Sequence, residues 1–350
     1  MFLAWREIKH DKRHFGLITA VISLVGILVF FLTGLAVGLM TIMTQGITNL
    51  GADDIALSDS ANDSVQASII PTKNAEKLKA DEVSLLGLSA LTIKKDADTQ
   101  LTAFAFGMEP NSFTAPEVSE GKMYLADKEV VVDSKFKTDG YKLGDEIKVT
   151  QGDETFKIVG FTKNATYSSY PIVFMNLKDW RETGIQFKDA VSAVATKGSV
   201  DQDSVSDANL KLQSVKDFNN NIPGVSAQNL TFALMVGALI VVSAVILGVF
   251  IFVLTLQKRR VFGVMKAQGI DNATLGWSVI WQTAFLSIFG SIFAVAITLA
   301  TAAAMPEAVP FTVPWLLFGI IGAVMVLFSL LGALFSVRSA TRIDPLIALK

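Results

Sequence analysis

The chain has 350 residues, of which 51% are hydrophobic and only 18% charged, and its formal net charge is -2. It contains no cysteine, which excludes disulfides, thiolate metal sites and cysteine nucleophiles. Its histidines, His10 and His14, both precede the first long apolar segment, which excludes a histidine-based zinc or catalytic centre further along the chain. The polar block 47–226 is acidic, so we expect no nucleic acid among the partners.

The chain contains four long apolar segments, one before the polar block and three after it. Each exceeds the roughly 20 residues that a helix needs to cross a bilayer. Lipid offers no partner to backbone polar groups, so we expect a helix in each segment. The first is too long for the apolar core of a signal peptide, about 7–15 residues, and is expected to be an uncleaved anchor. The fold class predicted is a membrane α-helical protein with four transmembrane helices (1+3) and an α+β extracytoplasmic domain.

Basic residues outside the polar block gather in three clusters and indicate the orientation. They are Arg6, Lys9, Lys12 and Arg13; Lys258, Arg259, Arg260 and Lys266; and Arg338, Arg342 and Lys350. Positive charge is enriched on the cytoplasmic side of membrane proteins. We therefore expect a multi-pass cell-membrane protein whose N- and C-termini are cytoplasmic and whose polar block is extracellular.

The predicted divisions follow the chain from its amphipathic start. They are a cytoplasmic elbow helix 1–14, a first transmembrane helix with a stalk 15–46, the extracytoplasmic domain 47–226, a second helix 227–257, a cytoplasmic coupling segment 258–273, a third helix 274–304, an outer loop 305–310, a fourth helix 311–337 and a cytoplasmic tail 338–350. Glycines spaced for close helix packing, Gly34 and Gly38, indicate either a contact between two protomers or ordinary membrane glycines.

The polar block mixes strand and helix patterns. Strands are predicted at 101–106, 129–133, 146–150, 155–161, 171–175 and 190–196, and helices at 75–78, 177–183 and 200–218. The Asp/Ser/Asn-rich stretch 51–65 is predicted to be a loop.

Three segments carry a family resemblance. The segment 257–270, QKRRVFGVMKAQGI, and the C-terminal 340–349, ATRIDPLIAL, are similar to motifs of ABC transporter permeases of the MacB/FtsX type. The VVV of 130–132, the LGDEI of 143–147 and the FKIVGF of 156–161 resemble the core of that family's extracytoplasmic domain. In length and layout the chain looks most like the haem-exporter (HrtB-type) branch of Gram-positive bacteria.

The resemblance implies a coupling segment that docks on a nucleotide-binding subunit. The residues implied are Arg259, Arg260, Phe262, Gly263, Met265, Lys266 and Gly269. Arg259 and Arg260 are equally explained as topology anchors. No phosphate-binding loop of the type G-x-x-x-x-G-K-[S/T] occurs in the sequence, so we expect a permease that is not itself an enzyme, with a separate ABC ATPase in two copies. A second permease copy, in a homodimer, is the simplest complement.

The apolar segments contain no ionisable residue, which argues against ion-coupled transport and against a hydrophilic substrate. An amphipathic substrate or purely mechanical transmission remains. The resemblance implies haem as a transported ligand, with no intrinsic cofactor. Candidate substrate-binding residues near the outer membrane edge are Met40, Met43, Met305, Glu307, Tyr167 and Tyr170, with Met40, Met305 and Glu307 as candidate iron ligands.

Alternatives stay open at this point. Methionine commonly fills apolar gaps and tyrosine commonly sits at membrane interfaces, so none of these side chains need be a ligand. A non-transporting, FtsX-like mechanotransmitter that regulates a cell-wall hydrolase is one alternative function. A permease that handles peptides or lipoproteins is another.

Overall fold

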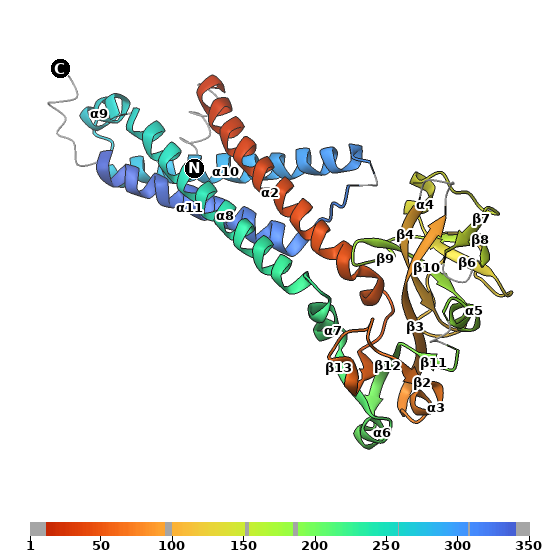
Figure 1. The fold of residues 1–350 in the computed structure, drawn as a ribbon. Coiled ribbons are helices and arrows are strands. Elements are labelled where there is room, and N and C mark those ends of the chain that lie inside the picture. The colour runs from red at the N-terminus through yellow and green to blue at the C-terminus, as the bar shows by residue number, and fades with distance from the viewer. Residues whose placement is uncertain are drawn as a thin grey trace. The chain divides into compact units, whose positions relative to one another are not determined.

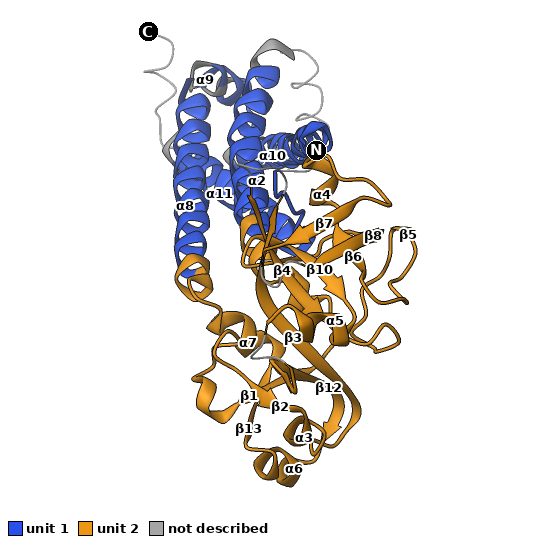
Figure 2. Ribbon diagram, turned by 45° about the vertical axis from the view of Figure 1, so that its right-hand side comes forward, with its two compact units in different colours: residues 1–38, 230–350 blue, residues 39–229 orange. Residues whose placement is uncertain are grey.

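The computed structural model describes residues 12–94, 100–150, 154–184, 188–257, 259–306 and 309–340. It divides into two compact units, one of residues 1–38 with 230–350 and the other of residues 39–229 (Figure 2). The predicted elbow up to residue 11, residues 151–153 and the C-terminal motif from residue 341 lie outside the described residues.

Four described helices are long and apolar enough to cross a membrane. They are α2 (Lys12–Thr48), α8 (Val225–Gln257), α10 (Asn272–Ala304) and α11 (Trp315–Ala340), and the short α9 (Arg259–Ala267) lies between α8 and α10 (Figure 1). This confirms the predicted one-plus-three arrangement of transmembrane helices around an α+β domain. The protein is accordingly a multi-pass membrane protein.

Local sequence explains where the helices begin and end. α10 begins after Asp271, whose side chain accepts a hydrogen bond from the backbone N–H of Thr274. α11 begins directly after Pro314, and α10 ends two residues before Pro306. α2 ends at Thr48, beyond the predicted stalk. Its residues 39–48 belong to the same compact unit as the outer domain.

Other residues of the same chain pack directly against Gly34 and Gly38. A Cβ atom on Gly34 would collide with the ring of Phe311, and one on Gly38 would collide with the carbonyl oxygen of Pro310. The backbone N–H of Thr312 also donates to the carbonyl oxygen of Gly34 at 3.2 Å. Of the two alternatives for this pair, the contact with a second protomer is disfavoured, because the segment after α10 already fills the groove that the two glycines leave.

The outer domain is built on one large sheet of strand order β13-β1-β12-β3-β4-β10-β6-β8-β5. The strands of the domain are β1 (Asp54–Ser58), β2 (Ile70–Pro71), β3 (Ala80–Lys94), β4 (Gln100–Gly107), β5 (Glu120–Gly121), β6 (Glu129–Asp133), β7 (Glu146–Val149), β8 (Thr155–Thr162), β9 (Thr166–Tyr167), β10 (Tyr170–Met175), β11 (Ala190–Val191), β12 (Ala193–Val200) and β13 (Leu210–Ser214). Of these, β2 and β11 pair with each other in a separate two-stranded sheet. Its helices are η1 (Asp59–Ala61), α3 (Thr72–Ala75), α4 (Lys135–Thr138), α5 (Leu177–Glu182), α6 (Gln202–Asp207) and α7 (Val215–Asn221).

The sheet carries a hydrophobic core on each face. Along β6, Val130 and Val132 belong to one cluster of buried side chains, whereas Val131 between them belongs to the other. This alternation follows from the two-residue period of a strand, and it explains why the continuous apolar run is so easily recognised in the sequence. Trp180 of α5 closes one face, because its indole lies where Cβ atoms on Gly87 and Gly107 would be.

Three of the local predictions are wrong. The predicted helix 200–218 is α6, then β13, then α7, because Leu210 and Leu212 pair with β1 at the sheet edge. The predicted loop 51–65 contains β1, and the predicted helix 75–78 lies one turn earlier as α3. For 200–218 and 51–65, the pairing of β1 with β13, far apart in sequence, overrides the local polar composition.

Candidate functional site

The end of α2 is held by the outer domain in an arrangement that we call the α2 seat: Ile42, Met43, Gly46, Thr48 and Asn49 with the groups that bind them. The turn between β9 and β10 provides the first contacts. The backbone N–H of Ser168 donates to the carbonyl oxygen of Met43 at 2.8 Å, and that of Ser169 to Ile42 at 3.3 Å. Both serines have positive φ angles, 51° and 71°, so the turn uses the left-handed region of backbone conformation.

Gly46 lets the helix approach the sheet closely. A Cβ atom there would collide with the side chain of Ile172 and would lie 2.9 Å from the carbonyl oxygen of Thr166. Ile47, one residue further, is fully buried in a core cluster of the outer domain. The last turn of α2 is thus part of the domain's own hydrophobic core.

Two amide side chains complete the seat. Asn49 donates from Nδ2 to the carbonyl oxygen of Asn164 at 2.8 Å, and Asn219 of α7 donates to Oγ1 of Thr48 at 3.2 Å. Because Asn164 follows β8 and α7 precedes α8, these bonds connect the end of α2 to both the sheet and the segment that leads out of the domain. The α2 seat therefore fixes residues 42–49 to the β9–β10 turn, to Asn164 and to α7.

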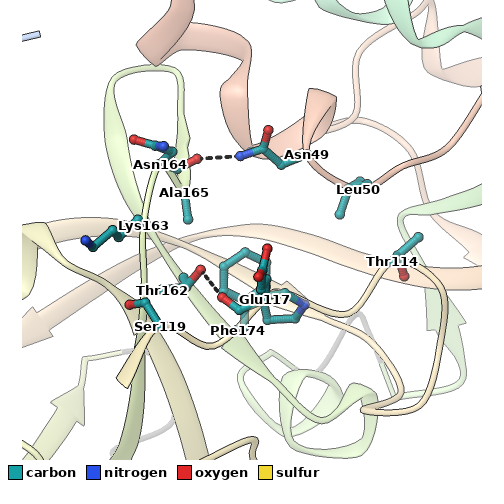
Figure 3. Close-up of a pocket in the computed structure, with 12 residues that line it drawn as sticks. Asn49, Leu50, Thr114, Glu117, Ser119, Thr162, Lys163, Asn164, Ala165 and Phe174 are labelled. Carbon is teal, nitrogen blue, oxygen red and sulfur yellow. Dashed lines mark hydrogen bonds between the residues drawn. The ribbon is translucent and has the colours of Figure 1, made fainter. Parts of the chain in front are cut away.

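A pocket of about 460 Å³ opens beside the seat (Figure 3). Its wall is formed by the end of α2, by the segment 114–119 and by the turn 162–165, with Leu50, Ala165 and Phe174 as apolar lining. Thr162 Oγ1 donates to the carbonyl oxygen of Glu117 at 2.7 Å and so ties two walls together. Glu117 and Lys163 supply its charged groups, and the lining includes no predicted ligand residue.

The predicted ligands in the outer domain meet at the α2 seat. Met43 packs against the same core cluster that contains Tyr167, and Tyr167 pairs with Tyr170 across the β9–β10 turn. Tyr167 is only 1% exposed, lies edge-on to Phe104 with ring centroids 4.8 Å apart, and burial raises the pKa of its phenol. An iron ligand must be accessible and a tyrosine ligand binds as phenolate, so the burial of Tyr167 disfavours it among the predicted ligands.

The other predicted ligands have different surroundings. Tyr170 is 44% exposed, and Met40 and Met43 are half-buried on α2, three residues apart. Met305 is half-buried directly after α10 and belongs to the other compact unit. Glu307 lies outside the described residues. Met40, Met43, Met305 and Tyr170 thus remain as candidate ligands with accessible atoms.

The predicted coupling segment forms α9. Val261 and Val264 are 46% and 47% exposed, whereas Met265 packs against the core of the membrane unit. Lys266 lies in the last turn, and Gly263 lies inside the helix. Arg259, Arg260 and Phe262 belong to α9 by backbone, and their side chains lie outside the described part of the structure.

Gly269 has a structural reason for its place in the motif. Its φ angle is +89°, its N–H donates to the carbonyl oxygen of Lys266 at 2.9 Å, and Ile270 donates to Met265 at 3.1 Å. These two bonds form a Schellman motif, which ends a helix with a left-handed residue that is usually glycine. Gly269 therefore sets the turn between α9 and α10 and keeps α9 short.

A second hollow, of about 600 Å³, lies on α10 and α11 with Phe30 of α2 at its edge. Its lining is apolar apart from Ser291, whose buried hydroxyl has no hydrogen-bond partner within the described ranges. Gly319 leaves its surface open, because no atom lies within 4 Å of where its Cβ would be. Both helices are long and apolar enough to span a membrane.

Known proteins resemble this chain in its membrane part and along most of its length. Residues 233–345 match the family model described as FtsX-like permease C-terminal. A putative hemin transport system permease protein HrtB of Staphylococcus epidermidis is 28% identical over 295 residues, which is 82% of this chain and 81% of that protein. An uncharacterized ABC transporter permease of Mycobacterium tuberculosis is 25% identical over 285 residues, 79% of this chain and 78% of that protein.

Among solved structures, the periplasmic region of MacB from Actinobacillus actinomycetemcomitans aligns with 51% of this chain and 97% of its own, with a TM-score of 0.37 and 12% identity. The extracellular domain of the transporter YknZ from Gram-positive bacteria aligns with 49% of this chain and 93% of its own, with a TM-score of 0.32 and 11% identity.

Proposed function

We propose that this chain, which carries an FtsX-like permease domain and is related in sequence to ABC transporter permeases, is the membrane subunit of an ABC efflux system for an amphipathic molecule, haem first. A separate ATPase subunit supplies the energy, and the permease acts as a homodimer. The observation that carries the proposal is α2, one unbroken helix from residue 12 to residue 48 whose last turn is built into the outer domain.

The length of α2 suits a mechanical link. At about 1.5 Å per residue its 37 residues extend about 55 Å, well beyond the roughly 30 Å of a bilayer's hydrocarbon core. In the proposed mechanism, closure of two cytoplasmic ATPases moves α9, and α2 and α8 carry that movement to the outer domain. The α2 seat converts a displacement of the helix into a displacement of the sheet.

Haem is the first substrate to test for two reasons. A relative of this chain is named as a hemin transport permease, and haem partitions into membranes, where helices without ionisable residues handle apolar groups well. In the absence of cysteine and of histidines beyond residue 14, the candidate iron ligands on the outer side are methionine, an exposed tyrosine and the carboxylate of Glu307. Met40, Met43, Met305 and Tyr170 are the described residues that meet this requirement, and Glu307 stays a candidate from the sequence.

The test is a haem titration of the purified chain in detergent, followed by visible absorption spectroscopy. We expect saturable binding with a spectrum that lacks bis-histidine character. Met40→Leu, Met43→Leu and Met305→Leu remove the sulfur atom while they keep the apolar volume, so loss of affinity in one of them identifies a ligand. Met235→Leu, on an exposed face of α8, is the matched control. Binding no greater than that of empty micelles would contradict the haem assignment.

A non-transporting mechanotransmitter is the second candidate, and the pocket beside the α2 seat favours it. A partner protein bound at that pocket would contact α2 and the sheet at once. Haem-loaded vesicles that contain the chain and its ATPase distinguish the two functions. ATP-dependent loss of haem from the membrane supports efflux, whereas ATP hydrolysis without haem release supports mechanotransmission.

A further inference from the structure

The coupling helix α9 is joined through the chain to α8 and α10 but not to α2. It follows α8 after Gln257 and precedes α10, which begins at Asn272, whereas α2 lies more than 200 residues earlier. A force applied to α9 reaches α8 and α10 through the backbone. Inside the membrane unit it reaches α2 across a contact between helices, and this is a shorter route than the one through α8 and the outer domain.

Two glycines bring α2 and α10 into backbone contact. A Cβ atom on Gly290 of α10 would lie 2.7 Å from Cγ2 of Ile22, and one on Gly26 of α2 would lie 2.7 Å from Cβ of Ala294. Both distances are shorter than real Cβ contacts, so neither site has room for a methyl group. Small residues allow membrane helices this close an approach.

The register of this contact is well defined. Ile22 meets Gly290 and Gly26 meets Ala294, so four residues along α2 correspond to four residues along α10 and the two helices run in the same direction. Between these pairs, Oγ of Ser23 donates to the carbonyl oxygen of Gly290 at 3.1 Å, and both Ser23 and Ile22 are buried. Contact through backbone and short side chains resists sliding more than contact through long, flexible side chains.

A second contact with the α10–α11 hairpin lies further along α2. Phe311, in the segment between α10 and α11, covers Gly34, and its ring centroid lies 5.9 Å from that of Phe31. Together with the hydrogen bond from Thr312 to Gly34, this fastens the segment that follows α10 onto α2. The α10–α11 hairpin therefore contacts α2 in two places, at Ile22–Gly26 and at Phe31–Gly34.

We infer that α10 is the element that moves α2, with Gly26 and Ala294 as the positioning residues of the contact. This inference rests on the proposed function, because it specifies the route by which the ATPase would act on the outer domain. A displacement of α9 is passed to α10 through the Gly269 turn, and α10 carries α2 with it as one body.

Adding a methyl group at Gly26 and removing one at Ala294 tests the contact between α2 and α10. Gly26→Ala places a methyl group against Cβ of Ala294, and Ala294→Gly removes that atom. In vesicles with the ATPase, we expect Gly26→Ala to lower ATP-dependent export about tenfold while ATP hydrolysis continues, and we expect the double variant Gly26→Ala/Ala294→Gly to restore it. Gly16→Ala is the control on the same helix, because no atom lies within 4 Å of its Cβ position.

A distance measurement tests the same inference without transport. The chain has no cysteine, so spin labels attach only where cysteines are introduced, at the exposed positions Leu24 of α2 and Ile292 of α10. We expect the distance between these labels to be the same with and without an ATP analogue. A change in that distance, or full export by Gly26→Ala, would overturn the inference. If the unsubstituted complex hydrolyses ATP but exports no haem, the proposed substrate fails while the label distance still decides the route.

Discussion

Ser168 and Met43 are joined by a backbone hydrogen bond of 2.8 Å, which fastens the β9–β10 turn to the last turns of α2. The two residues lie 125 positions apart in the sequence, and neither uses its side chain for the bond. Because the bond depends on backbone geometry, it constrains the conformation of the turn and the closeness of the helix rather than the identity of either residue. The α2 seat is therefore best tested at Gly46, because the close approach of the helix requires a residue without a side chain there.

Gly46→Ala should destabilise the outer domain. The added methyl group would collide with Ile172 and press on the carbonyl oxygen of Thr166, which belongs to the backbone and has little freedom to move. Overpacking of this kind costs about 1–3 kcal/mol. Hydrogen–deuterium exchange of the full chain in detergent should show faster exchange in β9 and β10, whereas Gly16→Ala, the same change at an open position of α2, should leave exchange there unaltered.

Trp180 should be the most sensitive side chain of the outer domain. It is fully buried against Gly87 and Gly107, and its Nε1 donates to Oγ of Ser89 at 2.9 Å. Trp180→Ala leaves a large cavity between helix and sheet, which should lower the free energy of unfolding by about 3–5 kcal/mol. Thermal unfolding of the full chain followed by near-ultraviolet circular dichroism measures the effect. Leu125→Ala, at a position 67% exposed in the same domain, should change the midpoint little, and equal shifts would contradict this view of the core.

The membrane helices and the strand at 129–133 could be predicted because lipid and a doubly covered sheet each require an uninterrupted apolar run. β13 could not, because Leu210 and Leu212 stand among polar residues and are recruited by β1, about 150 residues earlier. The α2 seat was hidden for a related reason. Its contacts use Gly46, the backbone of Ser168 and an Asn49–Asn164 bond across 115 positions, and none of these has a local sequence pattern.

Acid should remove the stabilisation that Glu129 provides. Its carboxylate accepts from Lys122 at 2.7 Å and from the backbone N–H groups of Leu125 and Ala126, and these bonds, that of Lys122 first, lower its pKa from 4.5. A lowered folded-state pKa means that the stabilisation is complete above the unfolded pKa and is lost as pH falls through the folded one.

Glu129→Gln should therefore lower the stability of the outer domain by about 1 kcal/mol at pH 7, with the difference vanishing well below pH 4. Thermal unfolding at several pH values measures both the size and the direction of the effect. Glu146→Gln, at an exposed glutamate of the same domain, is the control for the loss of one carboxylate charge. A gap between Glu129→Gln and the unsubstituted chain that widened in acid would show that the carboxylate is not stabilised in its charged form.

The exposed valines of α9 should determine whether the ATPase binds. Val261 and Val264 lie three residues apart and thus on one face of the helix, about half exposed, which is costly unless a partner covers them. Val264→Glu places a charge in that apolar face and should weaken association of the ATPase at least about tenfold, since burial of an unpaired carboxylate is strongly unfavourable. Gln268→Glu adds the same charge at an exposed position that is already polar and should leave association nearly unchanged.

Co-purification and ATPase stimulation measured on the two variants separate a specific apolar contact from a general effect of charge. If both variants bound the ATPase as well as the unsubstituted chain does, the docking face would have to lie elsewhere on the cytoplasmic side, and α9 would be only a connection between α8 and α10.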